Sequence, residues 1–103
     1  MAFRAAFIAH APDADVATHR AVIETPKYKL LVAVVRDQGQ ALAECRRLVE
    51  EEAIHAVMLC PGFTHRDVAE IAETVGEKVS VNVARGDGPG NRIAMEVIGR
   101  EWA

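Results

Sequence analysis

The sequence predicts an α/β domain in which a mainly parallel, four-stranded sheet is flanked by helices in three layers, Rossmann-like or flavodoxin-like. Four apolar segments begin roughly 25 residues apart, about the length that a strand, a crossover helix and two short loops require. Half of the 103 residues are hydrophobic but only 5% are aromatic, so aliphatic side chains must build the core. The length allows one domain, residues 1–103, and we expect the strand order 2-1-3-4.

The predicted strands cover residues 3–9, 30–35, 56–60 and 79–84. The second and third are uninterrupted apolar runs, which are typical of parallel strands covered on both faces. The fourth alternates valines with Ser80 and Asn82, as an edge strand with one wet face does. Repeated strand–helix units favour right-handed crossovers and a parallel sheet.

Helical spacing of apolar residues marks the segments 38–53, 64–75 and 91–98. Thr64 and Asp67 resemble a capping box at the start of the second helix, with aspartate in place of the usual glutamate. Gly76 is suited to terminate that helix in a left-handed conformation.

The segment between Asp13 and Lys29 has two interpretations. Asp13 can cap a helix that runs to about Ile23 and forms the first crossover, and we favour this interpretation. Alternatively, residues 20–24 form an extra strand that turns at Thr25-Pro26, because the residue before a proline resists the helical conformation.

Charge and composition exclude several classes of protein. The formal net charge is −3 and no basic stripe is present, so we expect no nucleic-acid partner. No apolar stretch approaches the roughly 18 residues of a membrane span, and the first residues do not form a signal peptide, so we expect no membrane association. Cys45 and Cys60 form no CxxC pair. Two unpaired thiols without an export signal predict a cytoplasmic protein.

Reactive or charged residues follow every predicted strand: His10, then Arg36-Asp37, then Cys60-Pro61-Gly62-Phe63, and finally Arg85-Gly86-Asp87. Because the carboxyl ends of parallel strands meet at one edge, where α/β proteins bind ligands, we expect these residues to line one pocket. The competing explanation is that strand ends are also where any chain returns to solvent.

Cys60 is the strongest candidate nucleophile. It lies just before the helix that begins near Thr64, where the helix dipole and free amides stabilise a thiolate. His10 or His65 would act as the base, which makes Cys60, His10 and His65 the candidate catalytic residues. Alternatively, Cys60 lines a polar site or packs as a small hydrophobe. Cys45 lies on the apolar stripe of its helix and is expected to be inert.

The glycine-rich segment 85–91 is a candidate anion site. Glycines let backbone amides approach an anion, and the start of the following helix is positive. The candidate ligand-binding residues are Arg85, Gly86, Gly88, Gly90 and Asn91, together with Asp37. We expect them to bind an anionic metabolite, although a tight turn into a helix explains the glycines equally well.

No cofactor motif is present, since both the phosphate-loop and the dinucleotide-binding spacings are missing, and we expect no cofactor. Asp13, Asp15 and His19 lie near His10 and are metal-ligand types, but their spacing matches no established site, so we expect no metal.

Several segments resemble a family of short bacterial and archaeal domains of uncharacterised function: Phe7-Ile8-Ala9-His10-Ala11-Pro12, His19-Arg20, Ile23-Glu24-Thr25-Pro26 and Leu59-Cys60-Pro61-Gly62-Phe63. The resemblance covers nearly the whole chain and implies a domain that stands alone, but it carries no activity. The repeated strand–helix units also look like part of a phosphate-binding barrel, a likeness that assigns no residue a role.

Two functions remain open. The first is a small-molecule site at the carboxyl edge, with thiol or acid–base chemistry on a carbonyl or carboxylate compound if the protein is an enzyme. The second is a non-catalytic oligomeric binding or regulatory module. An exposed sheet edge and the single tryptophan, Trp102, near the end of the chain favour a homo-oligomer, although Trp102 can equally fold back on its own core.

Overall fold

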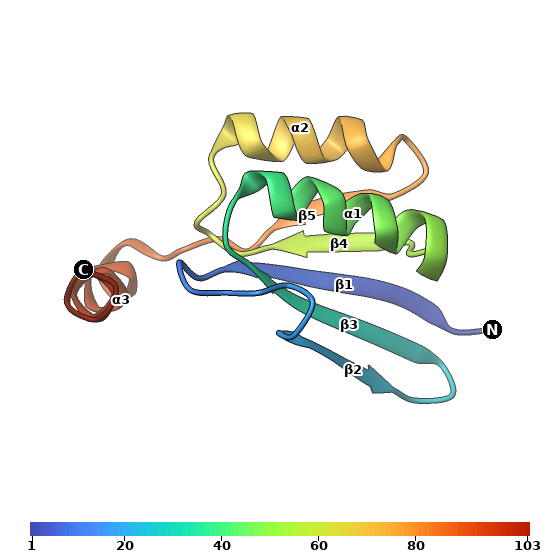
Figure 1. The fold of residues 1–103 in the computed structure, drawn as a ribbon, viewed down its shortest axis with the longest axis horizontal. Helices are drawn as coiled ribbons and strands as arrows, with labels where there is room; N and C mark the ends of the chain where they lie inside the picture. The colour runs from blue at the N-terminus through green and yellow to red at the C-terminus, as the bar shows by residue number, and fades with distance from the viewer.

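A computed structural model describes residues 1–103. Its elements are β1 (Phe3–His10), β2 (Arg20–Glu24), β3 (Tyr28–Val35), α1 (Gln38–Glu52), β4 (Ala56–Leu59), α2 (His65–Val75), β5 (Ser80–Val83) and α3 (Gly88–Glu101). The five strands form one sheet in the order β2-β3-β1-β4-β5. All neighbours are parallel except β2 and β3 (Figure 1). The fold is therefore α/β, as predicted, with a mostly parallel mixed sheet.

The sheet has five strands, so the prediction of four strands in the order 2-1-3-4 does not describe it completely. The extra strand is β2, and the favoured helix over residues 13–23 is wrong. The turn after β2 explains why: the Thr25 hydroxyl accepts hydrogen bonds from the backbone N–H groups of Lys27 (3.3 Å) and Tyr28 (3.0 Å). This turn lets β2 pair antiparallel with β3, from Arg20 opposite Ala33 to Glu24 opposite Lys29.

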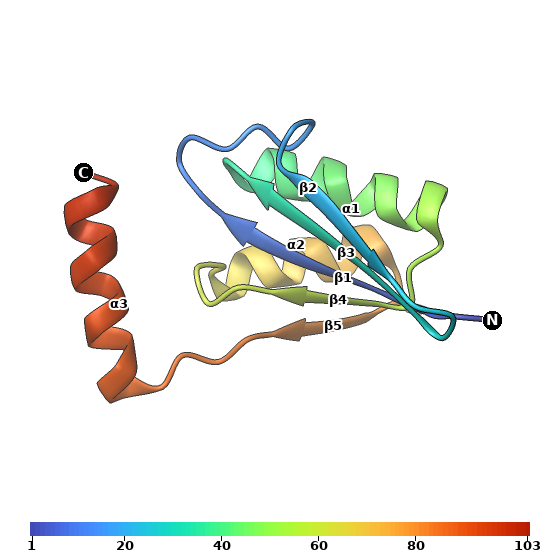
Figure 2. The same cartoon turned by 90° about the horizontal axis from the view of Figure 1, so that it is seen from below.

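The expected three layers are also absent, because α1 and α2 lie over the same face of the sheet (Figures 1 and 2). The connections β3–α1–β4 and β4–α2–β5 step across the sheet in one direction, and right-handed crossovers in one direction place their helices on one face. The connection from β1 to β3 steps the opposite way, so a helix there would have covered the other face. The strand β2 takes its place, and that face stays open.

The hydrophobic core lies between the sheet and these two helices. Its fully buried large side chains are Ile8, Val35, Leu48, Val57, Leu59 and Ile71, together with Cys45. Side-chain caps fix the starts of α1 and α2: in α1, Asp37 accepts from the Gln40 N–H at 2.8 Å. Thr64 and Asp67 form the predicted capping box, and Gly76, with φ of 83°, ends α2.

None of the three helices combines the length and apolarity needed to cross a bilayer.

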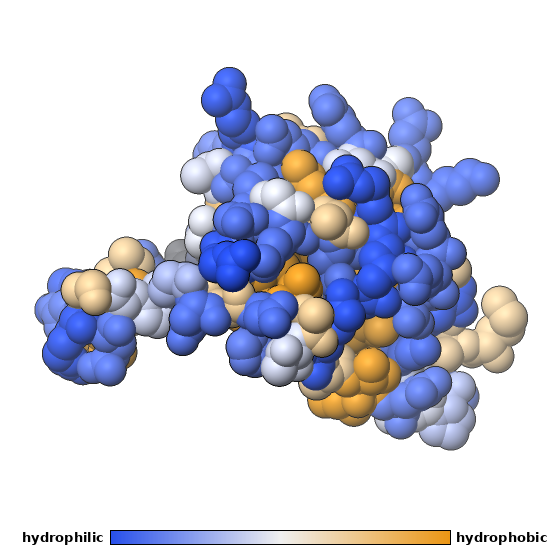
Figure 3. Space-filling view, in the orientation of Figure 1, coloured by the Kyte–Doolittle hydropathy of each residue, from blue (hydrophilic) through white to orange (hydrophobic).

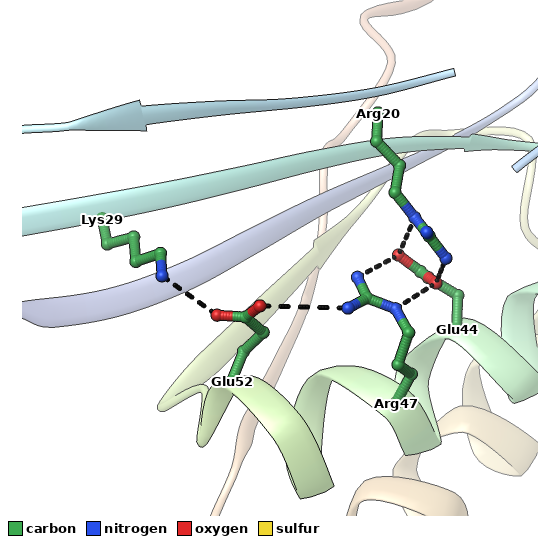
Figure 4. Close-up of polar contacts among 5 residues, drawn as sticks. All are labelled: Arg20, Lys29, Glu44, Arg47 and Glu52. Carbon is green, nitrogen blue, oxygen red and sulfur yellow. Dashed lines mark hydrogen bonds and ion pairs between the residues drawn. The ribbon is translucent and has the colours of Figure 1, made fainter. Parts of the chain in front are cut away.

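An ion-pair network around the buried carboxylate of Glu44 joins β2 to α1 (Figure 4). The Glu44 carboxylate accepts from Arg20 at 2.6 and 3.2 Å and from Arg47 at 2.9 and 3.0 Å. Lys29 and Glu52 extend it with a 3.0 Å ion pair. Burial alone would raise the pKa of Glu44, but the hydrogen bonds from Arg47 and Arg20 outweigh it and hold that pKa below its ordinary value.

Candidate functional site

The carboxyl ends of β1 and β4 bring His10 and Cys60 to the same cleft. The two strands are parallel neighbours, and the Cys60 N–H donates to the Ile8 carbonyl at 3.0 Å. A methyl group on Gly62 would lie 3.4 Å from His10 Nδ1 and 3.5 Å from Cys60 Sγ. The imidazole nitrogen and the thiol sulfur therefore flank one point beside Gly62, and the absence of a side chain there keeps the space between them open.

The imidazole of His10 is held by packing and not by hydrogen bonds. Its ring stacks on Phe63, with centroids 3.9 Å apart and planes 29° apart. Partial burial lowers the pKa of His10, while the negative charges of Asp67 and Asp37 oppose that shift. The lowered pKa favours the uncharged form of the ring at neutral pH, which has one nitrogen able to accept a proton or a hydrogen bond.

Helix α3 forms the second wall of the cleft. The chain leaves the sheet after β5 and α3 runs across the strand ends (Figure 2). The cleft encloses about 510 Å³ and is lined on the helix side by Ala94, Met95, Ile98 and Trp102. The opposite wall is formed by His10, Cys60, Pro61 and Gly62, and the floor near the loop by Gly86 and Asn91. It is an apolar cleft with an imidazole, a thiol and an amide.

Other residues predicted for the site lie outside this cleft. His65 is exposed in the first turn of α2 and does not line the cleft. The side chain of Arg85 is 88% exposed and pairs with Asp87 at 3.3 Å. Asp37 caps α1.

The glycines of the predicted anion loop differ in their surroundings. A methyl group on Gly86 would lie 3.3 Å from Asn91 Oδ1, because the asparagine side chain folds back against it. Gly88 and Gly90 have open space around them, in the first turn of α3. Of the six predicted ligand-binding residues, the structure thus brings Gly86 and Asn91 to the cleft.

Sequence reasoning missed the contribution of α3. Ala94, Ile98 and Trp102 recur at intervals of four residues, which places them on one face of a helix. That stripe, ending in the only tryptophan, was the available signal for a helix that packs across the strand ends.

The cysteines differ sharply. Cys45 is fully buried in α1, and its burial raises the pKa of the thiol to about 12. Cys60 is half-buried at the cleft.

The residues near Asp13 build a turn: the Asp15 N–H donates to His19 Nδ1 at 2.9 Å, and the Asp15 carboxylate accepts from Ala17 N–H and Thr18.

These features define an α/β fold with an apolar cleft at the carboxyl edge of a mostly parallel sheet. The chain belongs to a family of unknown function (DUF6506), which matches residues 3–97. No curated protein and no solved structure matches the chain.

The environment of His10 predicts a pH effect on stability. Since burial lowers its pKa in the folded state, the unfolded chain binds a proton more readily as pH falls below about 6.5. The stability of the protein should therefore decrease from pH 7.5 to pH 5.5. Replacement His10→Phe keeps a ring against Phe63 and should reduce this decrease, measured by urea unfolding at both pH values; His65→Phe should leave it unchanged. An unaltered decrease in His10→Phe would show that His10 is not the group responsible.

Proposed function

We propose that the protein binds a small organic compound in the cleft between the sheet and α3, with the polar end of the compound against His10 and Cys60. One observation carries the proposal: His10 Nδ1 and Cys60 Sγ flank the same open point beside Gly62, within a cleft of about 510 Å³. Ligand sites are commonly concave and apolar with a few converging polar groups. The apolar wall of α3 suits a ligand with a hydrocarbon body.

The chemistry that this pair supports is reversible addition of a thiol to a carbonyl. The lowered pKa leaves the His10 imidazole uncharged and able to take the Cys60 proton. The sulfur then forms a bond to the carbonyl carbon, and the proton passes from the imidazole to the former carbonyl oxygen. The product is a hemithioacetal, and no leaving group or further reactant is required.

The head group is proposed to be a carbonyl or a carboxylate that accepts hydrogen bonds. No lysine or arginine lines the cleft. The negative charge of an anionic ligand, which the sequence predicts, would therefore accept hydrogen bonds from the Asn91 amide and from the backbone of the loop. An anionic metabolite remains our preferred ligand class, bound without Arg85, which lies outside the cleft.

The single tryptophan provides the test. We would titrate aldehydes, 2-oxo acids and simple carboxylates while following Trp102 fluorescence, and measure how each protects Cys60 from alkylation. A true ligand should change the emission and slow the alkylation. His10→Phe should weaken binding at least about tenfold, the loss of one good hydrogen bond to the ligand.

His65→Phe is the matched control, because that histidine lies outside the cleft, and it should bind as the unaltered protein does. Binding that is equally strong in His10→Phe, or that leaves Cys60 unprotected, would contradict the proposal. So would the absence of binding by every compound in the panel.

A second candidate function is a non-catalytic oligomeric module. The observation that favours it is the open face of the sheet, which the fold leaves uncovered on the side opposite α1 and α2. In a module of this kind, the residues of the cleft serve only to pack against α3.

A further inference from the structure

The face of the sheet opposite α1 and α2, here called the open face, is apolar and uncharged. Strand alternation places on it Phe3, Ala5, Phe7, Leu30, Val32 and Met58, which line a hollow of about 720 Å³. The charged strand residues Arg4, Arg20, Glu24 and Lys29 all alternate to the other face. Figure 3 shows hydrophobic side chains, in orange, at the lower edge of the body over β2 and β3.

A second apolar surface is left uncovered on α3. No residue of this helix is buried. One stripe faces the cleft, but Ile93 and Val97, one turn apart on another side of the helix, are 61% and 42% exposed. We call this pair the outer stripe. The charged residues of α3 pair among themselves, Arg92 with Glu96 at 3.2 Å and Arg100 with Glu101 at 3.3 Å.

The exposed surface exceeds that of a compact monomer by about the area that a protein partner covers. The chain exposes 6746 Å², whereas a compact monomer of 11.2 kDa exposes about 5,700 Å². The excess, about 1,000 Å², matches the roughly 800 Å² that each partner contributes to a standard protein interface. The radius of gyration, 14.0 Å, likewise exceeds the value of about 13 Å expected for this length.

We propose that the protein is a symmetric homodimer in which the outer stripe of α3 from each copy packs on the open face of the other. A helix of 14 residues is about 21 Å long, close to the width of five strands spaced about 4.8 Å apart. This reciprocal packing of each α3 on the other copy covers both apolar surfaces with one two-fold interface. The uninterrupted apolar sequences of β3 and β4 are typical of strands that are covered on both faces. In this dimer, α3 of the partner would cover the face that α1 and α2 leave open.

The test measures molecular mass by sedimentation over a series of protein concentrations. The unaltered chain should sediment at twice 11.2 kDa. Val97→Glu, on the outer stripe, and Ile23→Glu, on the open face of β2, should each raise the dimer dissociation constant at least about tenfold. Ile23 pairs with Leu30 in the register that defines the open face.

Matched controls lie beside each substitution. Val22→Glu is an adjacent, 54% exposed strand residue that points to the opposite face, and Glu96→Gln lies on the charged side of α3. Both should remain dimeric. Circular dichroism should show that all four variants are folded.

Mixing the two disruptive variants gives the sharpest result. A homodimer of Val97→Glu has no intact helix-to-sheet contact, and neither has a homodimer of Ile23→Glu. A heterodimer of the two retains one intact contact, so mixing should restore dimer.

A monomer at every concentration would overturn the proposal. A dimer that Ile23→Glu disrupts but Val97→Glu does not would also overturn it, because it would indicate that two sheets pack directly. A dimer that only Val97→Glu disrupts would indicate packing between helices, and it would overturn the proposal as well.

Discussion

Alkylation of the native protein at neutral pH should modify Cys60 and leave Cys45 intact. Cys45 is fully buried, and its pKa is raised from 9.0 to about 12. Because the thiolate is the reacting species, a rise of that size lowers its reactive fraction about a thousandfold, before burial limits access further. The rates are measured by mass spectrometry of peptides after treatment with iodoacetamide for increasing times.

Unfolding in guanidinium provides the internal control, since both thiols should then react at similar rates. Cys60→Ala should leave the native protein almost unreactive, whereas Cys45→Ala should retain the fast reaction. Equal rates for the two cysteines in the native state would contradict the placement of Cys45 in the core and of Cys60 at the cleft.

Replacement Glu44→Gln should lower the free energy of unfolding by roughly 2–4 kcal/mol. The Glu44 carboxylate is 2% exposed and accepts hydrogen bonds from both Arg20 and Arg47. An amide removes the charge and supplies one acceptor oxygen for the four bonds. Urea unfolding at neutral pH measures the difference.

Acid should reduce the difference in the free energy of unfolding between Glu44→Gln and the unaltered protein. The pKa of Glu44 is held below its ordinary value of 4.5 by the arginines, so its contribution is present above that value and is lost as pH falls through the lower pKa of the folded state. Glu51→Gln is the matched control, because Glu51 is exposed on the same helix and forms no ion pair. If Glu44→Gln were as stable as Glu51→Gln, the network would not be what fastens β2 to α1.

Much of the fold was predictable because its signals are local. The apolar runs at residues 30–35 and 56–60 predicted β3 and β4, and the pair Thr64 and Asp67 predicted the start of α2. Caps and periodicity depend on neighbouring residues, so they are visible in a single sequence.

The segment at β2 was not predictable in the same way. Residues 13–23 carry a plausible helix start at Asp13, and the competing strand is stabilised by distant partners. Arg20 reaches Glu44 and Val22 pairs with Leu31. Those contacts decide between two acceptable local conformations, and they follow from tertiary structure.

The candidate site was predicted in part. Parallel strands carried His10 and Cys60 to one edge, as expected, because His10 ends β1 and Cys60 directly follows β4, and these two strands pair directly. The position of α3 depended on the direction that the chain takes after β5, which the Gly-rich segment does not determine. For that reason Arg85 was expected in the site and Trp102 was not.

Cys60 and Trp102 should face each other across the cleft, and their proximity can be measured directly. A nitroxide attached to Cys60 of a Cys45→Ala chain should quench most of the fluorescence of Trp102, the only tryptophan. Unfolding the labelled protein should restore the emission. Unquenched fluorescence in the folded, labelled protein would show the opposite, that α3 does not form a wall of the cleft that holds His10 and Cys60.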